Sequence, residues 1–144
     1  MPDWELRVRE RLIAIQSEIL DAFWTLSHRN MDGTLTYGYV YAKLEEIRNS
    51  ARTAREFLSN YLSKNPALSK VFGEFLSSVE THCAYYGGKA ESSFALPITL
   101  EDWERLRALP EIWKKWISEI ILSIAPRRKK PKKGGPWTSL PGPE

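Results

Sequence analysis

Residues 4–26 read WELRVRERLIAIQSEILDAFWTL. Apolar side chains recur in this stretch at steps of three or four, which is the spacing of one face of an α-helix. The pattern ends before residues 30–33, Asn-Met-Asp-Gly, whose composition is typical of a turn. We therefore expect a long first helix with an apolar stripe made up of Trp4, Val8, Leu12, Ile15, Ile19, Phe23 and Leu26.

A second long helix is predicted from apolar side chains that continue at helical steps from Val40 to Tyr61. Residues 34–41 are rich in β-branched and aromatic side chains, so a short strand is the alternative there. Because the helical spacing is not interrupted, we expect the helix to begin near Thr36 or Tyr37. The first two helices then form a long helix–turn–helix over residues 4–62.

Proline and glycine mark the limits of a third helix. Asn65 and Pro66 suit its N-cap and its first helical position. We expect Gly87-Gly88 to end this helix, and residues 87–98 to form a loop.

The last helical segment is predicted to consist of two parts. Thr99 stands three residues before Asp102, which is the spacing of a capping box at a helix start. Pro110 then predicts a stop, a kink or a new start. Beyond it, a broad apolar face extends from Ile112 to Ile124.

The predicted fold is all-α: a bundle of about four helices in residues 1–125, followed by a Pro/Gly-rich basic tail in residues 126–144. The tail has six basic residues against the single acid Glu144, a net charge of +5, so the whole-chain charge of +3 leaves −2 for residues 1–125. A flexible polycation gains affinity for phosphates by counterion release and reads no sequence. Nucleic-acid binding is therefore predicted for Arg127, Arg128, Lys129, Lys130, Lys132 and Lys133. A localisation signal, a solubilising end, and a patch for an acidic partner or a membrane surface are the alternatives.

A row of arginines adds a second candidate for phosphate contact. Arg48, Arg52 and Arg55 follow one another at steps of four and three on one side of the second helix. The alternative is a solvated helix face on which these arginines pair with Glu45 and Glu56.

No pattern in the sequence indicates catalysis or a metal site, so we expect neither an enzyme nor a cofactor. His82 and Cys83 are adjacent on a helix and do not face each other. Residues 28–39 resemble an EF-hand loop but lack the first and last acidic ligands. The acids at Glu101, Asp102 and Glu104 are explained by the favourable helix dipole in a first turn.

Tryptophan is abundant, with six residues in 144. Trp113 and Trp116 lie on a helix that is apolar over more than one face, which predicts contact with another subunit as well as with the bundle. The alternative is a well-filled core. Trp137 in the tail is the candidate anchor for a pocket on a neighbouring subunit.

These features together resemble the nucleocapsid or major capsid proteins of filamentous viruses that infect hyperthermophilic archaea. The likeness is one of architecture: a small helical chain, a long helix–turn–helix over residues 4–62, Arg-bearing helices and terminal extensions. It implies helices that wrap double-stranded DNA and hold it in an A-like form, inside a helical filament of paired subunits. On this resemblance, the residues that would face phosphate are Arg7, Arg11, Arg48, Arg52 and Arg55.

The function expected from the sequence is the coating of double-stranded DNA, without sequence preference, by copies of this chain or by it and a related second subunit. The alternatives are a small helix–turn–helix DNA-binding regulator and a protein-binding helical adaptor or antitoxin-like bundle. The lone Cys83 leaves no disulfide within the chain, and the N-terminal residues do not read as a signal peptide. We expect a virion or cytoplasmic location and no secretion.

Overall fold

The computed structural model describes residues 3–124, with side chains from Glu5 onward, and the predicted tail lies outside this range. Within these residues the chain is all-α, as predicted, with no strand. The helices are α1 (Asp3–Met31), α2 (Tyr37–Ser63), α3 (Pro66–Ser93), α4 (Leu100–Leu106) and α5 (Leu109–Ile124).

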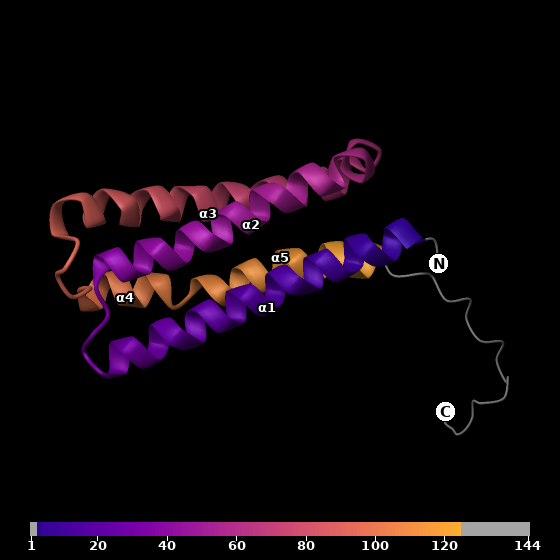
Figure 1. Cartoon of the computed structure of the whole chain (residues 1–144). Helices are drawn as coiled ribbons and strands as arrows, with labels where there is room; N and C mark the ends of the chain where they lie inside the picture. The colour runs from indigo at the N-terminus through magenta and orange to yellow at the C-terminus, as the bar shows by residue number, and fades with distance from the viewer. Residues whose placement is uncertain (1–2, 125–144) are drawn as a thin grey trace, which may run out of the picture.

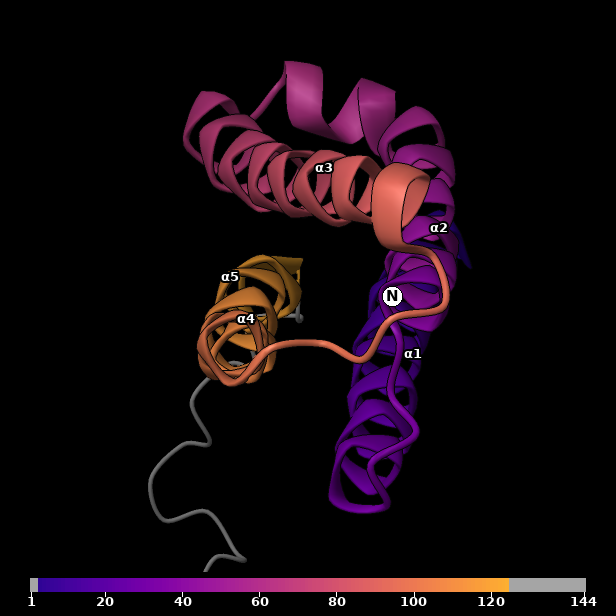
Figure 2. The same cartoon turned by 90° about the vertical axis from the view of Figure 1, so that its left-hand side faces the viewer.

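The helices form an antiparallel bundle with four legs, and α4 and α5 together make the fourth leg (Figure 1). Successive legs run in opposite directions, because the connections between them are short. Each leg packs on two neighbours: α1 on α2, α2 on α3, α3 on α5, and α5 back on α1. The view along the bundle shows the legs around a shared core (Figure 2). The first and last described residues lie at the same end of the bundle.

A short extended segment precedes α2. Thr36 pairs with Pro97 in an isolated antiparallel bridge. The first two N–H groups of α2, on Tyr37 and Gly38, donate to carbonyl oxygens in the loop after α3, at 3.1 and 2.9 Å. These donors have no partner inside the helix, so the loop satisfies them. Residues 34–41 thus begin extended and become helical at Tyr37, as expected for the helix start.

The prediction that Gly87-Gly88 ends the third helix is wrong. α3 continues through both glycines to Ser93, and the predicted loop shrinks to residues 94–99. A Cβ atom on Gly87 would lie 2.8 Å from Tyr41 Cε1 on α2. Glycine at this position therefore permits the close packing of α2 on α3. That packing offsets the helix-propensity cost of about 1 kcal/mol for a glycine relative to alanine.

The other signals for helix boundaries are found at the expected places. Thr99 Oγ1 accepts a hydrogen bond from the N–H of Asp102 at 3.1 Å, which is the predicted cap of α4. Asn65 and Pro66 occupy the N-cap and first position of α3, although the Asn65 side chain donates to a carbonyl in the last turn of α2 instead of capping. Pro110 is the second residue of α5, where its missing N–H costs no helical hydrogen bond.

The core is formed by the predicted stripes of α1, α2, α3 and α5, which are buried against one another. Trp113 is completely buried at its centre, and its ring makes edge contacts with Phe23 and Phe75, with centroids 5.8 and 6.2 Å apart. The indole N–H donates to Ser78 Oγ at 3.0 Å, so this polar atom has a partner in the apolar interior. The alternative of a well-filled core is therefore correct for Trp113.

None of the helices within residues 3–124 combines the length and the apolar character that a membrane crossing requires.

Candidate nucleic-acid interface

The predicted arginine row of α2 lies beside α3, and two of its three members are paired with acids. The guanidinium of Arg48 lies 3.3 Å from Glu45, one turn away on α2. Arg52 Nε donates to Glu80 Oε2 on α3 at 2.7 Å. The alternative interpretation, in which these arginines pair with acids, is therefore correct for Arg48 and Arg52. The partner of Arg52 is Glu80 and not the expected Glu56. Arg55 is exposed and makes no ion pair with any described residue.

Arg7 and Arg11 lie on the other side of α2, in a groove that α1 and α2 form together. Their phosphate-binding role was implied by the resemblance, and the structure places them away from the row of Arg48, Arg52 and Arg55. A depression of about 420 Å³ is lined by Arg7, Val8, Phe57, Asn60, Tyr61 and Lys64. An adjoining depression of about 340 Å³ is lined by Arg7, Glu10, Arg11, Ala14 and Phe57. The two are referred to below as the α1/α2 groove.

The cations of this groove have no acidic partner. Arg7, Arg11 and Lys64 are exposed, and none of them makes an ion pair with another residue of the range 3–124. Glu10 at the rim is the only acid among the lining residues. An anion that enters the groove therefore meets guanidinium and ammonium groups whose hydrogen-bonding capacity is not used by carboxylates.

An exposed aromatic ring, Phe57, forms the floor between these cations. Its side chain is 43% exposed, and the Arg11 guanidinium lies over the ring, 5.2 Å from its centroid. This cation–π contact fixes the direction of a long side chain that is otherwise free to move. Tyr61 lines the same groove, and burial together with the nearby Glu5 charge raises the pKa of its hydroxyl. The phenol therefore stays neutral beside an anionic ligand.

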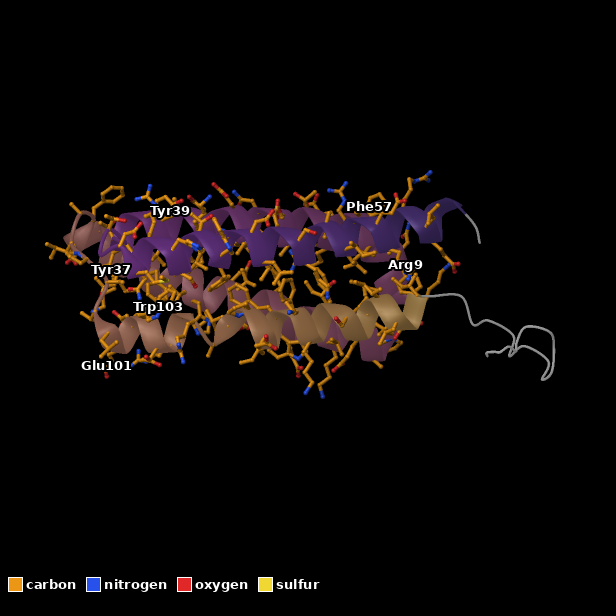
Figure 3. All side chains as sticks on the ribbon, turned by 90° about the horizontal axis from the view of Figure 1, so that it is seen from below. Arg9, Tyr37, Tyr39, Phe57, Glu101 and Trp103 are labelled. Carbon is orange, nitrogen blue, oxygen red and sulfur yellow. The ribbon has the colours of Figure 1, made fainter. Side chains whose placement is uncertain are left out.

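The groove is lined by residues from the start of α1 and the end of α2, and these helix ends lie at the end of the bundle where α5 finishes (Figure 1). Arg9 lies between α1 and α5 at this end, and Phe57 lies on the far side of α1 from α5 (Figure 3). The Arg9 Nε atom is buried without a hydrogen-bond partner among the described residues. The tail cations, from Arg127 to Lys133, and Trp137 lie outside the described residues.

The prediction of a subunit contact through Trp113 is wrong, because this side chain has no exposed surface. Its indole is used to fill the core between α1, α3 and α5. Trp116 is half-buried and packs against the core from the side.

A polar cluster around Asp102 was not found from the sequence, which explained this acid by the capping box with Thr99 and by the helix dipole. Its carboxylate is buried and accepts hydrogen bonds from the hydroxyls of Tyr37 at 2.5 Å and Tyr85 at 2.8 Å. Its backbone carbonyl accepts one from Tyr86 at 2.9 Å. The cluster therefore connects α2, α3 and α4 at the end opposite the α1/α2 groove. Figure 3 shows Tyr37 and Trp103 at that end and Arg9 at the other.

The charged form of the Asp102 carboxylate is stabilised by hydrogen-bond donors and by nearby cations. Burial opposes its charge, but hydrogen bonds from Tyr37 and Tyr85 and the charges of Lys89 and Arg105 outweigh burial and lower the pKa of the carboxyl. A carboxylate paired in this way connects the helices that carry its partners. The spacing to Thr99 predicted the cap, but no local signal brings tyrosines from two other helices to this acid.

Cys83 and His82, on α3, are the neighbouring residues with potentially reactive side chains. Cys83 is completely buried, and burial raises the pKa of its thiol, which disfavours the nucleophilic thiolate. The His82 ring bonds to the carbonyl of Ser78 one turn earlier, at 2.8 Å. Across the described residues, no group of three or more His, Cys, Asp or Glu side chains is arranged to hold a metal ion.

Phe57, Tyr61 and Lys64 are the groove residues that sequence reasoning missed. A signal for Phe57 existed, because it is a large aromatic that lies off the buried stripe of α2. No protein family, curated protein or solved structure was found to match the chain.

Proposed function

We propose that the protein is a structural, non-enzymatic nucleic-acid-binding protein. On this proposal it coats double-stranded DNA without sequence preference, as copies that assemble side by side, in the manner of the nucleocapsid proteins it resembles. The observation that carries the proposal is the α1/α2 groove, in which Arg7, Arg11 and Lys64 surround an exposed aromatic ring and lack acidic partners. The six basic residues of the tail sequence, which lie outside the described residues, add to this positive charge.

The groove suits a phosphate backbone better than base edges. Its cations come from two helices, Arg7 and Arg11 from α1 and Lys64 from the C-cap of α2, so no single helix presents all three to base edges as a recognition helix does. Contacts from Arg and Lys to phosphates position a protein on DNA and carry no sequence information. The expected binding is therefore independent of sequence and strongly dependent on salt.

The magnitude of the salt dependence follows from the number of cations. Each neutralised phosphate contributes about 0.9 to the slope of log K against log salt concentration. The three groove cations would contribute about 2.7, and the six cations of the tail about 5.4. A chain truncated after Ala125 should thus retain about one third of the slope.

The proposal is tested by binding the full chain and the truncated chain to random-sequence duplexes over a salt series. Saturation at a fixed number of base pairs per protein, with weaker but measurable binding after truncation, is the expected result. Absence of binding at low salt would refute the proposal and favour a protein partner. A preference of 1,000-fold or more for one duplex sequence, on the order shown by specific readers, would instead favour a regulator.

A further inference from the structure

The outer face of α1 carries five large apolar side chains that the fold leaves uncovered. Their exposed fractions lie between 43% and 79%. These residues, called here the α1 outer stripe, are Leu6, Ile13, Leu20, Trp24 and Met31.

The α1 outer stripe forms a straight line along the helix. Its members are separated by steps of seven, seven, four and seven residues. A step of seven keeps the same heptad position and a step of four leads from d to a, so Leu6, Ile13 and Leu20 take d positions and Trp24 and Met31 take a positions of a single seam. The buried stripe of α1, which includes Leu12 and Ile19, lies about 100° or more around the helix from the outer stripe and faces the core. α1 is therefore apolar on two faces, and only one of them is used inside the chain.

The largest member of the stripe is held in place. The Trp24 ring lies against the His28 ring, with centroids 3.8 Å apart and a tilt of 32° between the planes, and the His28 Nδ1 atom is hydrogen-bonded to the Trp24 carbonyl oxygen at 2.9 Å. An exposed tryptophan fixed in this way loses little side-chain freedom when a partner covers it. Rigid aromatic anchors of this kind dominate the binding energy of many interfaces.

We propose that the α1 outer stripe is the contact between two copies of this chain, which pack antiparallel through α1. This inference rests on the assembly of copies in the proposed function, but not on nucleic-acid binding. The stripe exposes on the order of 500 Å² of apolar surface, if a large side chain has roughly 170 Å² to expose. Two copies would bury about 1,000 Å² from the stripe alone, and specific interfaces bury about 1,200–2,000 Å² in total. The polar residues beside the stripe supply the remainder.

Four of the five stripe residues pair with one another when one helix is reversed, and Leu20 lies opposite Ser17. With a two-fold axis between Glu18 and Ile19, Leu6 lies opposite Met31 of the second copy, and Ile13 lies opposite its Trp24. In this register each a position meets a d position, as in antiparallel coiled coils. The same residue pairs recur on both sides of the axis, which is the requirement for a closed dimer.

Charge also favours the antiparallel arrangement over the parallel one. Glu10 and Ser27 continue the line of the stripe. In the antiparallel register Glu10 lies opposite Ser27 of the second copy. In a parallel pair Glu10 would lie opposite Glu10, where two like charges destabilise the contact.

The dimer reaches only the rim of the α1/α2 groove, where Glu10 lies in the line of the stripe. Arg7 and Arg11 lie a quarter turn or more from the stripe and face α2. Each dimer would therefore present two such grooves.

Self-association of the full chain without DNA tests the proposal. The wild-type protein, 16.6 kDa per chain, should sediment as a dimer. Leu20→Glu places a charge beside the two-fold axis and should yield monomers. Leu122→Glu on α5 is the matched control, since Leu122 is 73% exposed and lies on another helix, and it should remain dimeric. Trp24→Ala should weaken the dimer by at least about 30-fold, the effect of a hot-spot residue.

Two outcomes would overturn the proposal. One is a wild-type chain that is monomeric at about 100 µM, a concentration far above the micromolar Kd typical of a weak specific dimer. The other is a monomeric wild-type chain that binds vesicles of phosphatidylcholine and phosphatidylglycerol and loses this binding in Leu20→Glu, which would assign the stripe to a lipid surface. Circular dichroism of each variant checks that the helices remain. Because no DNA is present, failure here leaves the salt-dependent binding of the proposed function unaffected.

The orientation is tested by spin labels on introduced cysteines, since the natural Cys83 is buried. Labels at Glu18→Cys lie near the axis and should be within about 20 Å of each other. Labels at Arg29→Cys should be more than about 30 Å apart, given the rise of 1.5 Å per residue along the helix. Short distances at both positions would show a parallel pair and refute the antiparallel register.

Discussion

Replacing Tyr37 with phenylalanine should destabilise the protein more than the same change at Tyr85, although both hydroxyls donate to Asp102. The Tyr37 side chain is buried, whereas the Tyr85 side chain is exposed. In Tyr85→Phe, water can replace the lost donor. In Tyr37→Phe, it cannot reach the carboxylate oxygen on that side. The Tyr37 hydroxyl also accepts a hydrogen bond from the Thr99 N–H at 3.3 Å, and this contact is lost with it.

The magnitudes follow from the kinds of hydrogen bond removed. A buried hydrogen bond to a charged group contributes about 1.5–3 kcal/mol, so Tyr37→Phe should lower the free energy of unfolding by about 2 kcal/mol. Tyr85→Phe should lower it by less than about 1 kcal/mol. Asp102→Ala leaves the Tyr37 hydroxyl buried without its acceptor and should cost at least about 3 kcal/mol.

Urea unfolding followed by circular dichroism at 222 nm measures these differences, provided that the slope of free energy against urea concentration is unchanged. A thermal scan should show Tyr37→Phe melting about 6–8 °C below the wild type, given about 3–4 °C per kcal/mol for a chain of this length. Equal losses in the free energy of unfolding for the two tyrosine variants, or no loss for Asp102→Ala, would show that the polar cluster around Asp102 does not stabilise the fold in this way.

Two further predictions concern pH and helix packing. The folded-state pKa of Asp102 is lowered, so its contribution to stability is complete above the unfolded pKa of about 3.9 and is lost as pH falls through the folded value. Urea unfolding between pH 2 and 6 should therefore show that the free energy of unfolding falls more steeply with decreasing pH in the wild type than in Asp102→Asn. Identical pH profiles for the two proteins would contradict this. Gly87→Ala should cost about 1–3 kcal/mol, because the new Cβ would lie 2.8 Å from Tyr41. A Cβ atom added at Gly88 would have no atom within 4 Å, so Gly88→Ala should stabilise the helix by up to about 1 kcal/mol. Equal changes in the free energy of unfolding for the two glycine variants would argue against the close contact of α2 and α3.

The helical architecture could be predicted because it depends on local spacing. The stripes from Val8 to Leu26 and from Val40 to Leu58 are buried as their periods require. The cap at Thr99 involves residues three apart and is equally readable. Gly87-Gly88 misled the prediction because a glycine pair reads as a helix end, and the reason for Gly87 lies on another helix, at Tyr41.

The candidate site was harder to predict because it depends on which side of a helix faces a neighbour. Arg48 and Arg52 are close in sequence to Arg55, but acids on α2 and α3 pair with the first two. Phe57 and Lys64 join Arg7 only once α1 and α2 are packed. The same limit applied to Trp113, since sequence alone does not show which tryptophan fills the core.

The central claim is that unpaired cations in the α1/α2 groove bind DNA phosphates, and a matched pair of triple variants tests it most directly. In the chain truncated after Ala125, Arg7→Gln/Arg11→Gln/Lys64→Gln removes the groove cations. Arg52→Gln/Arg107→Gln/Lys114→Gln removes the same charge from side chains that are paired with Glu80, Glu104 and Glu111. The measurement is the slope of log K against log salt concentration for a random duplex. The account predicts a loss of about 2.7 in slope for the groove variant and little change for the control. Equal losses in both variants would show that net charge, and not the groove, determines binding.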